Sequence, residues 1–189
     1  MDSGLIYFKD GELVANSGDV CIYNFMNMLH LEIGPGHNLW AIESELEDYI
    51  WQLNDKPRGN CLEIGLGLGV ASRYILSCPK VNSLTTVEIN EDVIKAQKQA
   101  NYIDDDRHLI LNADGLTYMY ATKRTFDFVF IDCYSVIDEE TLPLIADYVK
   151  ASKKLLAFDG EVMGWFDKMT PEEFVGPFFD LFGRRNNYG

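Results

Sequence analysis

The chain has 189 residues, of which 47% are hydrophobic and 24% are charged, which fits one globular domain with a substantial core. Its 30 acidic and 16 basic residues give a formal net charge of −14. A surface this acidic repels phosphate backbones, so the composition predicts no nucleic-acid partner and favours a small or cationic substrate. No apolar run approaches the roughly 20 residues of a membrane-spanning helix, and the start Met1-Asp2-Ser3-Gly4 is unlike a secretory signal. We therefore expect a cytoplasmic protein without a membrane partner.

The four cysteines follow no metal-binding pattern. No two of them are spaced as C-x-x-C, and no histidine lies at zinc-site spacing from any of them. We expect reduced thiols and no metal site. The four are Cys21, Cys61, Cys78 and Cys133.

Residues 1–38 predict a β-rich extension packed on the rest of the chain. The apolar runs 5–8 and 13–14 flank the turn Asp10-Gly11, which is typical of a hairpin. A third extended run covers residues 20–23, and residues 32–38, with Gly34-Pro35-Gly36, are expected to form a loop.

Residues 39–189 predict one α/β unit. Apolar residues at helical spacing indicate a helix over residues 42–53. Strands are predicted at residues 60–64, 83–89, 108–111, 126–131 and 155–158, helices at residues 70–77, 90–102 and 139–151, and a last helix starting at the cap Thr170. This alternation predicts a mostly parallel sheet with helices on both faces, a Rossmann-like three-layer sandwich.

A glycine-rich loop, Gly65-Leu66-Gly67-Leu68-Gly69, follows the first of these strands and precedes a helix. Glycines at alternate positions allow a sharp turn and close approach of the backbone to a ligand. A dinucleotide fold would place its third glycine at Val70, and Glu63 would repel a pyrophosphate but can pair with an ammonium group. The loop therefore favours S-adenosylmethionine, with Glu63, Gly65, Leu66, Gly67 and Gly69 as ligand-binding residues; the alternative is a turn without a ligand.

Acidic residues follow the next two strands. Glu88, with its neighbour Ile89, ends the second strand, where a carboxylate can accept hydrogen bonds from both ribose hydroxyls. Asp114, with Gly115, follows the third strand and is predicted to bind the adenine amino group. An ordinary Asp-Gly turn is the other reading of that pair.

Asp132 ends the fourth strand and is the candidate catalytic residue. Ligands of open parallel sheets bind beyond the carboxyl ends of the strands, where the strand order reverses, and the first and fourth strands should flank that point. Asp132 would orient or deprotonate a nucleophile there, and Tyr134 would stack on or hydrogen-bond a substrate. The alternative for Asp132 is a helix-capping or loop acid.

Residues 60–158 resemble the class I S-adenosylmethionine-dependent methyltransferase fold, and within it the spermidine synthase (aminopropyltransferase) branch. The segments that carry the resemblance are residues 86–94, TVEINEDVI, residues 112–119, NADGLTYM, and residues 126–132, FDFVFID. The resemblance implies a sheet of order 3-2-1-4-5. It also implies ribose binding by Glu88, adenine binding by Asp114 and an acid–base role for Asp132.

Two departures from that branch bear on the reaction. Polyamine synthases have a D-x-x-D-P type sequence at the catalytic aspartate, whereas Asp132 is followed by Cys133-Tyr134-Ser135-Val136. Their glycine loop also carries an aspartate, which is missing here. The chain further leaves little room for the family's closing C-terminal hairpin, and an exposed sheet edge would favour a homodimer.

The sequence by itself thus favours an S-adenosylmethionine-dependent methyltransferase with a small-molecule acceptor. The first alternative is a spermidine synthase-like aminopropyltransferase that uses decarboxylated S-adenosylmethionine and an amine. The second is a nucleoside-binding module without catalysis.

Overall fold

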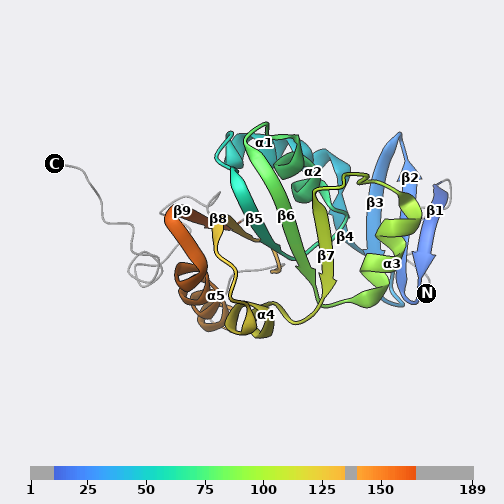
Figure 1. Ribbon diagram of the computed structural model, residues 1–189. Coiled ribbons are helices and arrows are strands. Elements are labelled where there is room, and N and C mark those ends of the chain that lie inside the picture. The colour runs from blue at the N-terminus through green and yellow to red at the C-terminus, as the bar shows by residue number, and fades with distance from the viewer. Residues whose placement is uncertain (1–10, 135–139, 165–189) are drawn as a thin grey trace, which may run out of the picture.

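The computed structural model describes residues 11–134 and 140–164, which form two sheets and the helices around them (Figure 1). The N-terminal sheet contains β1 (Glu12–Ser17), β2 (Val20–Phe25), β3 (Met28–Ile33) and β4 (Asn38–Ile42). The second sheet contains β5 (Gly59–Ile64), β6 (Val81–Glu88), β7 (His108–Asn112), β8 (Phe126–Ile131) and β9 (Leu156–Gly164). The helices are the short 3-10 turn η1 (Glu43–Glu45), α1 (Leu46–Leu53), α2 (Val70–Ser77), α3 (Glu91–Ala100), α4 (Gly115–Ala121) and α5 (Leu142–Leu155).

The second sheet is parallel throughout, with the strand order β7-β6-β5-β8-β9. This is the predicted order 3-2-1-4-5, so the predicted α/β fold is confirmed. Side chains alternate between the two faces along each strand. On β5, Cys61 belongs to the core shared with α1, α2 and α3, whereas Leu62 belongs to the core under α4 and α5. The sheet is therefore covered on both faces, which explains why its central strands β5 and β8 are so apolar.

The N-terminal sheet is antiparallel, with the order β1-β2-β3-β4. It lies beside α3 (Figure 1), and Ser17 Oγ donates a 2.6 Å hydrogen bond to Asp92 Oδ1 of that helix. Its inner side chains, among them Ile22 and Leu31, share one buried cluster with Leu84 and Phe128 of the parallel sheet. The extension and the α/β unit are therefore held together by a continuous core.

Three local expectations differ from the structure. The predicted loop 32–38 is shorter in the structure, because β3 runs to Ile33 and β4 begins at Asn38. The helix expected from Ile42 begins as a 3-10 turn at Glu43, because residues 38–42 pair with β3 instead. Helix α4 was not predicted.

Helix α4 begins at a cap that resembles an ordinary turn in the sequence. Asp114 is its N-cap, and its Oδ1 accepts a 2.8 Å hydrogen bond from the amide of Thr117. The glycine that follows the cap lowers helix propensity, and Met119, which is fully buried, anchors the helix through tertiary packing. The hairpin turn expected at Asp10 and the helix expected from Thr170 lie outside the described residues. Within the described part of the chain, no helix is long and apolar enough to span a membrane.

Candidate functional site

The glycine loop joins β5 to α2 and has backbone conformations that suit glycine. Gly65, Gly67 and Gly69 have φ values of +98°, +51° and +81°. A Cβ on Gly65 would lie 2.1 Å from the carbonyl oxygen of Asp132. The main chain at the start of the loop therefore packs directly against the main chain just after β8. The amide of Asp132 also donates to the carbonyl of Ile64 at 2.8 Å. The structure thus brings together the loop and the predicted catalytic aspartate.

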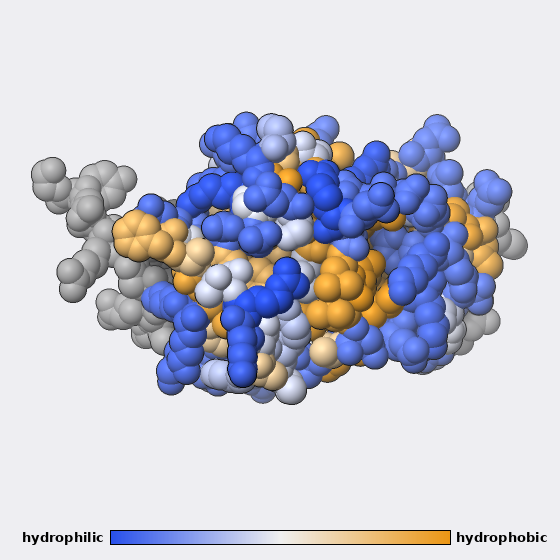
Figure 2. Space-filling model, viewed as in Figure 1, coloured by the Kyte–Doolittle hydropathy of each residue, from blue (hydrophilic) through white to orange (hydrophobic). Residues whose placement is uncertain are grey.

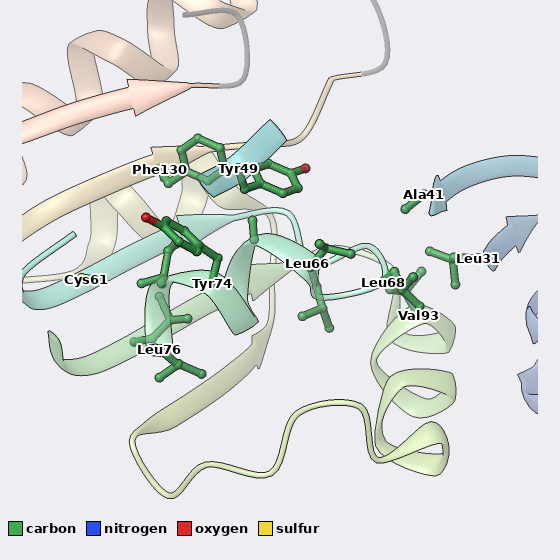
Figure 3. Packing of buried hydrophobic residues seen from close by; sticks show 14 of the residues in the cluster. Leu31, Ala41, Tyr49, Cys61, Leu66, Leu68, Tyr74, Leu76, Val93 and Phe130 are labelled. Atoms are coloured by element: carbon green, nitrogen blue, oxygen red, sulfur yellow. The ribbon is translucent and has the colours of Figure 1, made fainter. Parts of the chain in front are cut away.

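The two leucines of the loop are core residues. Leu66 and Leu68 are buried and pack in one cluster with Leu31, Ala41 and Val93 (Figure 3). The loop is therefore fixed to the N-terminal sheet and α3 by apolar contacts. The amide of Leu66 donates to Glu88, and ligand binding by Leu66 stays a prediction.

Glu88, at the end of β6, organises the next part of the site. Its Oε2 accepts from the amide of Leu66 at 2.9 Å, and its Oε1 accepts from the amide of Asn90 at 2.8 Å. Each carboxylate oxygen has a second lone pair, so both retain capacity for ribose hydroxyls. Its neighbour Ile89 is 69% exposed, and Asn112 of β7 donates to the carbonyls of both residues at 3.0 Å. The ends of β6 and β7 are thereby held together.

Asp114 lies at the same carboxyl edge, after β7. Its hydrogen bonds from Thr117 hold the pKa of the Asp114 carboxyl below its usual range. A Cβ on Gly115 would lie 2.7 Å from Ile64 Cγ2 and 2.8 Å from the hydroxyl oxygen of Tyr148. Gly115 therefore lets the start of α4 pack closely against β5 and α5. The capping role of Asp114 is visible in the structure, and adenine binding by Asp114 stays a prediction.

Asp132 has a partner that the sequence did not reveal. The hydroxyl of Tyr49, on α1, donates a 2.6 Å hydrogen bond to Asp132 Oδ2. The ring of Tyr49 packs edge-on against Phe130, with 5.9 Å between ring centroids (Figure 3). Burial, followed by the negative charge of Asp132, raises the pKa of Tyr49, so the phenol stays protonated and remains a donor. Helical spacing identified Tyr49 only as a core residue, because the contact joins residues 83 positions apart.

Tyr134 packs toward α5. Its ring lies edge-on to that of Tyr148, with centroids 5.8 Å apart. Burial raises the pKa of the neighbouring Cys133 thiol to about 12, so this thiol is a poor nucleophile. The Tyr134 hydroxyl is buried, and within the described residues it has no hydrogen-bond partner at good geometry. The catalytic role predicted for Tyr134 stays a prediction.

Glu63 is the most deeply buried acid of the site, with 1% of its surface exposed. Its Oε2 accepts hydrogen bonds from Ser72 Oγ and, at 2.6 Å, from Thr86 Oγ1. Its Oε1 is buried and has no hydrogen-bond partner in the described structure. Burial raises the pKa of Glu63 to about 8 despite these two hydrogen bonds. An oxygen of this kind fits a ligand that brings a donor, as an ammonium group does.

The described residues contain no cluster of three or more histidine, cysteine, aspartate or glutamate side chains suited to a metal ion. What they contain is a glycine loop and acidic side chains at the carboxyl edge of a parallel sheet, where its strand order reverses. Such an edge is the ligand-binding edge of open α/β sheets.

Solved structures share this fold. A spermidine synthase from Thermotoga maritima matches with a TM-score of 0.61 and 19% sequence identity, covering 79% of this chain and 54% of that one. A putative S-adenosylmethionine-dependent methyltransferase from Streptococcus mutans matches with a TM-score of 0.60 and 15% identity, over 89% of this chain and 47% of that one. The fold is therefore the Rossmann-like fold that these transferases share.

Residues 51–169 match the model of the spermine/spermidine synthase domain, and the chain belongs to this family. A polyamine aminopropyltransferase from Hydrogenobaculum sp. is 30% identical over 110 residues, which are 56% of this chain and 39% of the relative. One from Bacillus mycoides is 27% identical over 129 residues, 65% of this chain and 47% of the relative. The chain thus spans less than half the length of these relatives. The resemblance to the spermidine synthase branch is confirmed.

The preference for methyl transfer is wrong. The matching family is that of spermine and spermidine synthases, and the curated relatives are polyamine aminopropyltransferases. The preference rested on the loop leucines and on the missing second acid after Asp132. In the structure Leu66 and Leu68 serve packing, so they say little about the group that is transferred. A ligand of the S-adenosylmethionine type, decarboxylated or not, agrees with both kinds of relative.

Proposed function

We propose that this chain binds decarboxylated S-adenosylmethionine and transfers its aminopropyl group to a small amine. The observation that supports this best is the meeting of the glycine loop, Glu88 and Asp132 at one edge of the sheet, with Asp132 held by Tyr49. The family and the names of the curated relatives support the aminopropyl group as the one transferred.

The reaction is an in-line displacement, so the protein mainly aligns the two reactants and excludes water. The nitrogen of the acceptor amine attacks the aminopropyl carbon next to sulfur, the carbon–sulfur bond breaks, and methylthioadenosine leaves as a neutral thioether. The attacking nitrogen must lose a proton, and the Asp132 carboxylate is the group placed to take it. The hydrogen bond from Tyr49 to Asp132 Oδ2 would hold the carboxylate in position for this proton transfer. Glu88 would hold the ribose.

An Asp132→Asn variant tests this assignment. It keeps the shape of the side chain and an acceptor for Tyr49 but cannot take a proton. We expect the rate of aminopropyl transfer to fall at least 100-fold, the size of a lost general base, while the affinity for the donor changes less than about threefold. Transfer is measured with labelled donor and a set of diamines, and donor affinity is measured by calorimetry.

Asp104→Asn is the matched control, because Asp104 is exposed and lies away from the sheet edge; it should behave as wild type. Donor binding without transfer in the wild type, to any amine of the set, would contradict the proposed reaction. Failure to bind decarboxylated S-adenosylmethionine, S-adenosylmethionine and methylthioadenosine would contradict the proposed site as a whole.

A further inference from the structure

Three acids lie on one face of the parallel sheet, at its carboxyl edge. Glu63 of β5 pairs in register with Thr86 of β6 and with Phe130 of β8. Glu88 and Asp132 come two residues later on these two neighbours, and residues two apart on a strand point to the same face. Glu63 is thus flanked by the ligand-facing acids Glu88 and Asp132, and it is the deepest of the three.

Within residues 11–134 and 140–164, the groups around Glu63 include hydroxyl donors but no cation. Ser72 of α2 and Thr86 of β6 both donate to Oε2, and Thr86 Oγ1 also lies 2.8 Å from His108 Nε2 of β7. Burial lowers the pKa of His108 to about 4, so this imidazole is neutral at pH 7. The remaining titratable groups that act on Glu63 or feel its charge are Tyr49 of α1, Cys61 of β5, Glu88 of β6 and Asp132 at the end of β8. All of them are neutral or negative.

The Glu63 carboxylate has one oxygen that accepts two hydrogen bonds, one oxygen without a donor in the described structure, and two acidic neighbours. A buried charge that is not paired is costly, so the ligand-free site favours the neutral carboxyl form. This agrees with the raised pKa of Glu63, about 8, which burial causes. An ammonium group supplies what is missing, because it brings both a positive charge and a donor for Oε1. A neutral thioether brings neither.

We propose that Glu63 gives up a proton when the donor binds, so that its carboxylate pairs with the primary ammonium group of the aminopropyl chain. The balance is simple: the protonated carboxyl and the ammonium ligand become an ion pair, and one proton leaves to the buffer. This inference rests on the proposed function. It assigns to Glu63 the part of the same site that distinguishes the cationic donor from the neutral product. Product release would then be aided by reprotonation of Glu63.

Calorimetric titrations in buffers of different ionisation enthalpy count the released protons. At pH 7 we expect close to one proton released for decarboxylated S-adenosylmethionine and close to none for methylthioadenosine. The affinity for the donor should rise about tenfold per pH unit between pH 6 and pH 7.5, because the ionised fraction of Glu63 then rises in that proportion. The affinity for methylthioadenosine should stay flat.

Glu63→Gln should abolish both the proton release and the pH dependence, while Glu47→Gln, a matched change on the exposed face of α1, should leave both as in wild type. Donor binding without proton release, or the same release in Glu63→Gln, would overturn the inference and leave the proposed function intact. If no adenosyl ligand binds, both fall together.

A second variant covers the case in which Glu63→Gln does not fold. Ser72→Ala removes one hydroxyl that stabilises the ionised carboxylate, so the pH at which donor affinity levels off should move upward by about one unit. An unchanged pH profile in Ser72→Ala would also overturn the inference.

The stability of the ligand-free protein gives a separate test. As pH rises from the unfolded-state pKa of Glu63 to about 8, only the unfolded chain ionises at this residue, so the free energy of unfolding falls. Wild type should therefore lose stability relative to Glu63→Gln between pH 5 and pH 8.

Discussion

Gly65 brings the glycine loop into main-chain contact with Asp132 at the carboxyl edge of the parallel sheet. Its φ of +98° is rare for other residues, and a side chain there would run into the Asp132 carbonyl. The same few atoms therefore set the loop conformation and the position of Asp132. Glu88 would have a similar double task, because it accepts a hydrogen bond from the Leu66 amide and is proposed to bind the ribose. At this scale, the residues that fix the loop conformation are also the ones proposed to bind the ligand.

We expect Gly65→Ala to destabilise the protein by a few kcal/mol, because the added Cβ meets a backbone oxygen and the backbone is strained. Chemical denaturation measures the change. Gly36→Ala is the matched control: its φ is not positive, and the nearest atom to a Cβ there, Asn38 Nδ2, is 3.6 Å away. The control should change stability by less than about 0.5 kcal/mol. Equal effects of the two changes would refute the proposed contact.

The N-terminal sheet is attached to the α/β unit by polar contacts that converge on Glu43. Its Oε2 accepts from the amide of Leu29 in β3 at 3.2 Å. Its Oε1 accepts from Arg73 of α2 and from the Tyr102 hydroxyl, both at 3.2 Å. The Arg73 guanidinium also lies over the Tyr102 ring, 4.8 Å from its centroid. One residue of the 3-10 turn thus ties a strand, a helix and a loop together.

Glu43→Ala should loosen β3 and β4 without unfolding the parallel sheet. The hydrogen bonds are partly exposed, so we expect a loss of about 1–2 kcal/mol. Hydrogen exchange should speed up at residues 28–42 and stay unchanged in β5 and β8. Glu47→Ala, on the exposed side of the next helix, serves as the control. Uniform acceleration across both sheets would show that Glu43 supports the whole molecule instead.

On the scale of the whole molecule, acidic residues outnumber basic ones by 14. Hydrophilic side chains cover most of the face in Figure 2, with apolar side chains gathered near its middle. A negative field of this size draws cationic ligands toward the protein and repels anions. The site itself adds Glu88 and Asp132 at one edge, so the overall field and the local charge favour the same kind of ligand.

Salt should therefore weaken the binding of the cationic donor more than that of the neutral product. Between 20 and 300 mM NaCl we expect the association rate constant of decarboxylated S-adenosylmethionine to fall several-fold, because screening shortens the reach of the field. Methylthioadenosine, which is neutral, should change little. Stopped-flow fluorescence measures both. The same salt dependence for both ligands would mean that the net charge plays no part in capture.

The sequence by itself predicted the parallel sheet and the residues at its carboxyl edge from local patterns, and the strand order through the family resemblance. Apolar runs, the glycine spacing and the acids that end β6 and β8 all lie within short stretches. It did not determine the group transferred: Leu66 and Leu68 suggested methyl transfer, yet they are packing residues whose partners come from distant elements.

Only the tertiary structure showed the contact of Tyr49 with Asp132 and the closed surroundings of Glu63. It also showed that residues 38–42 form a strand, which pairs with β3, and that residues 115–121 form a helix, which packs against β5 and α5. The physical reason is the same in each case. Burial, pairing and pKa are set by groups that the fold brings together, and no local pattern records them.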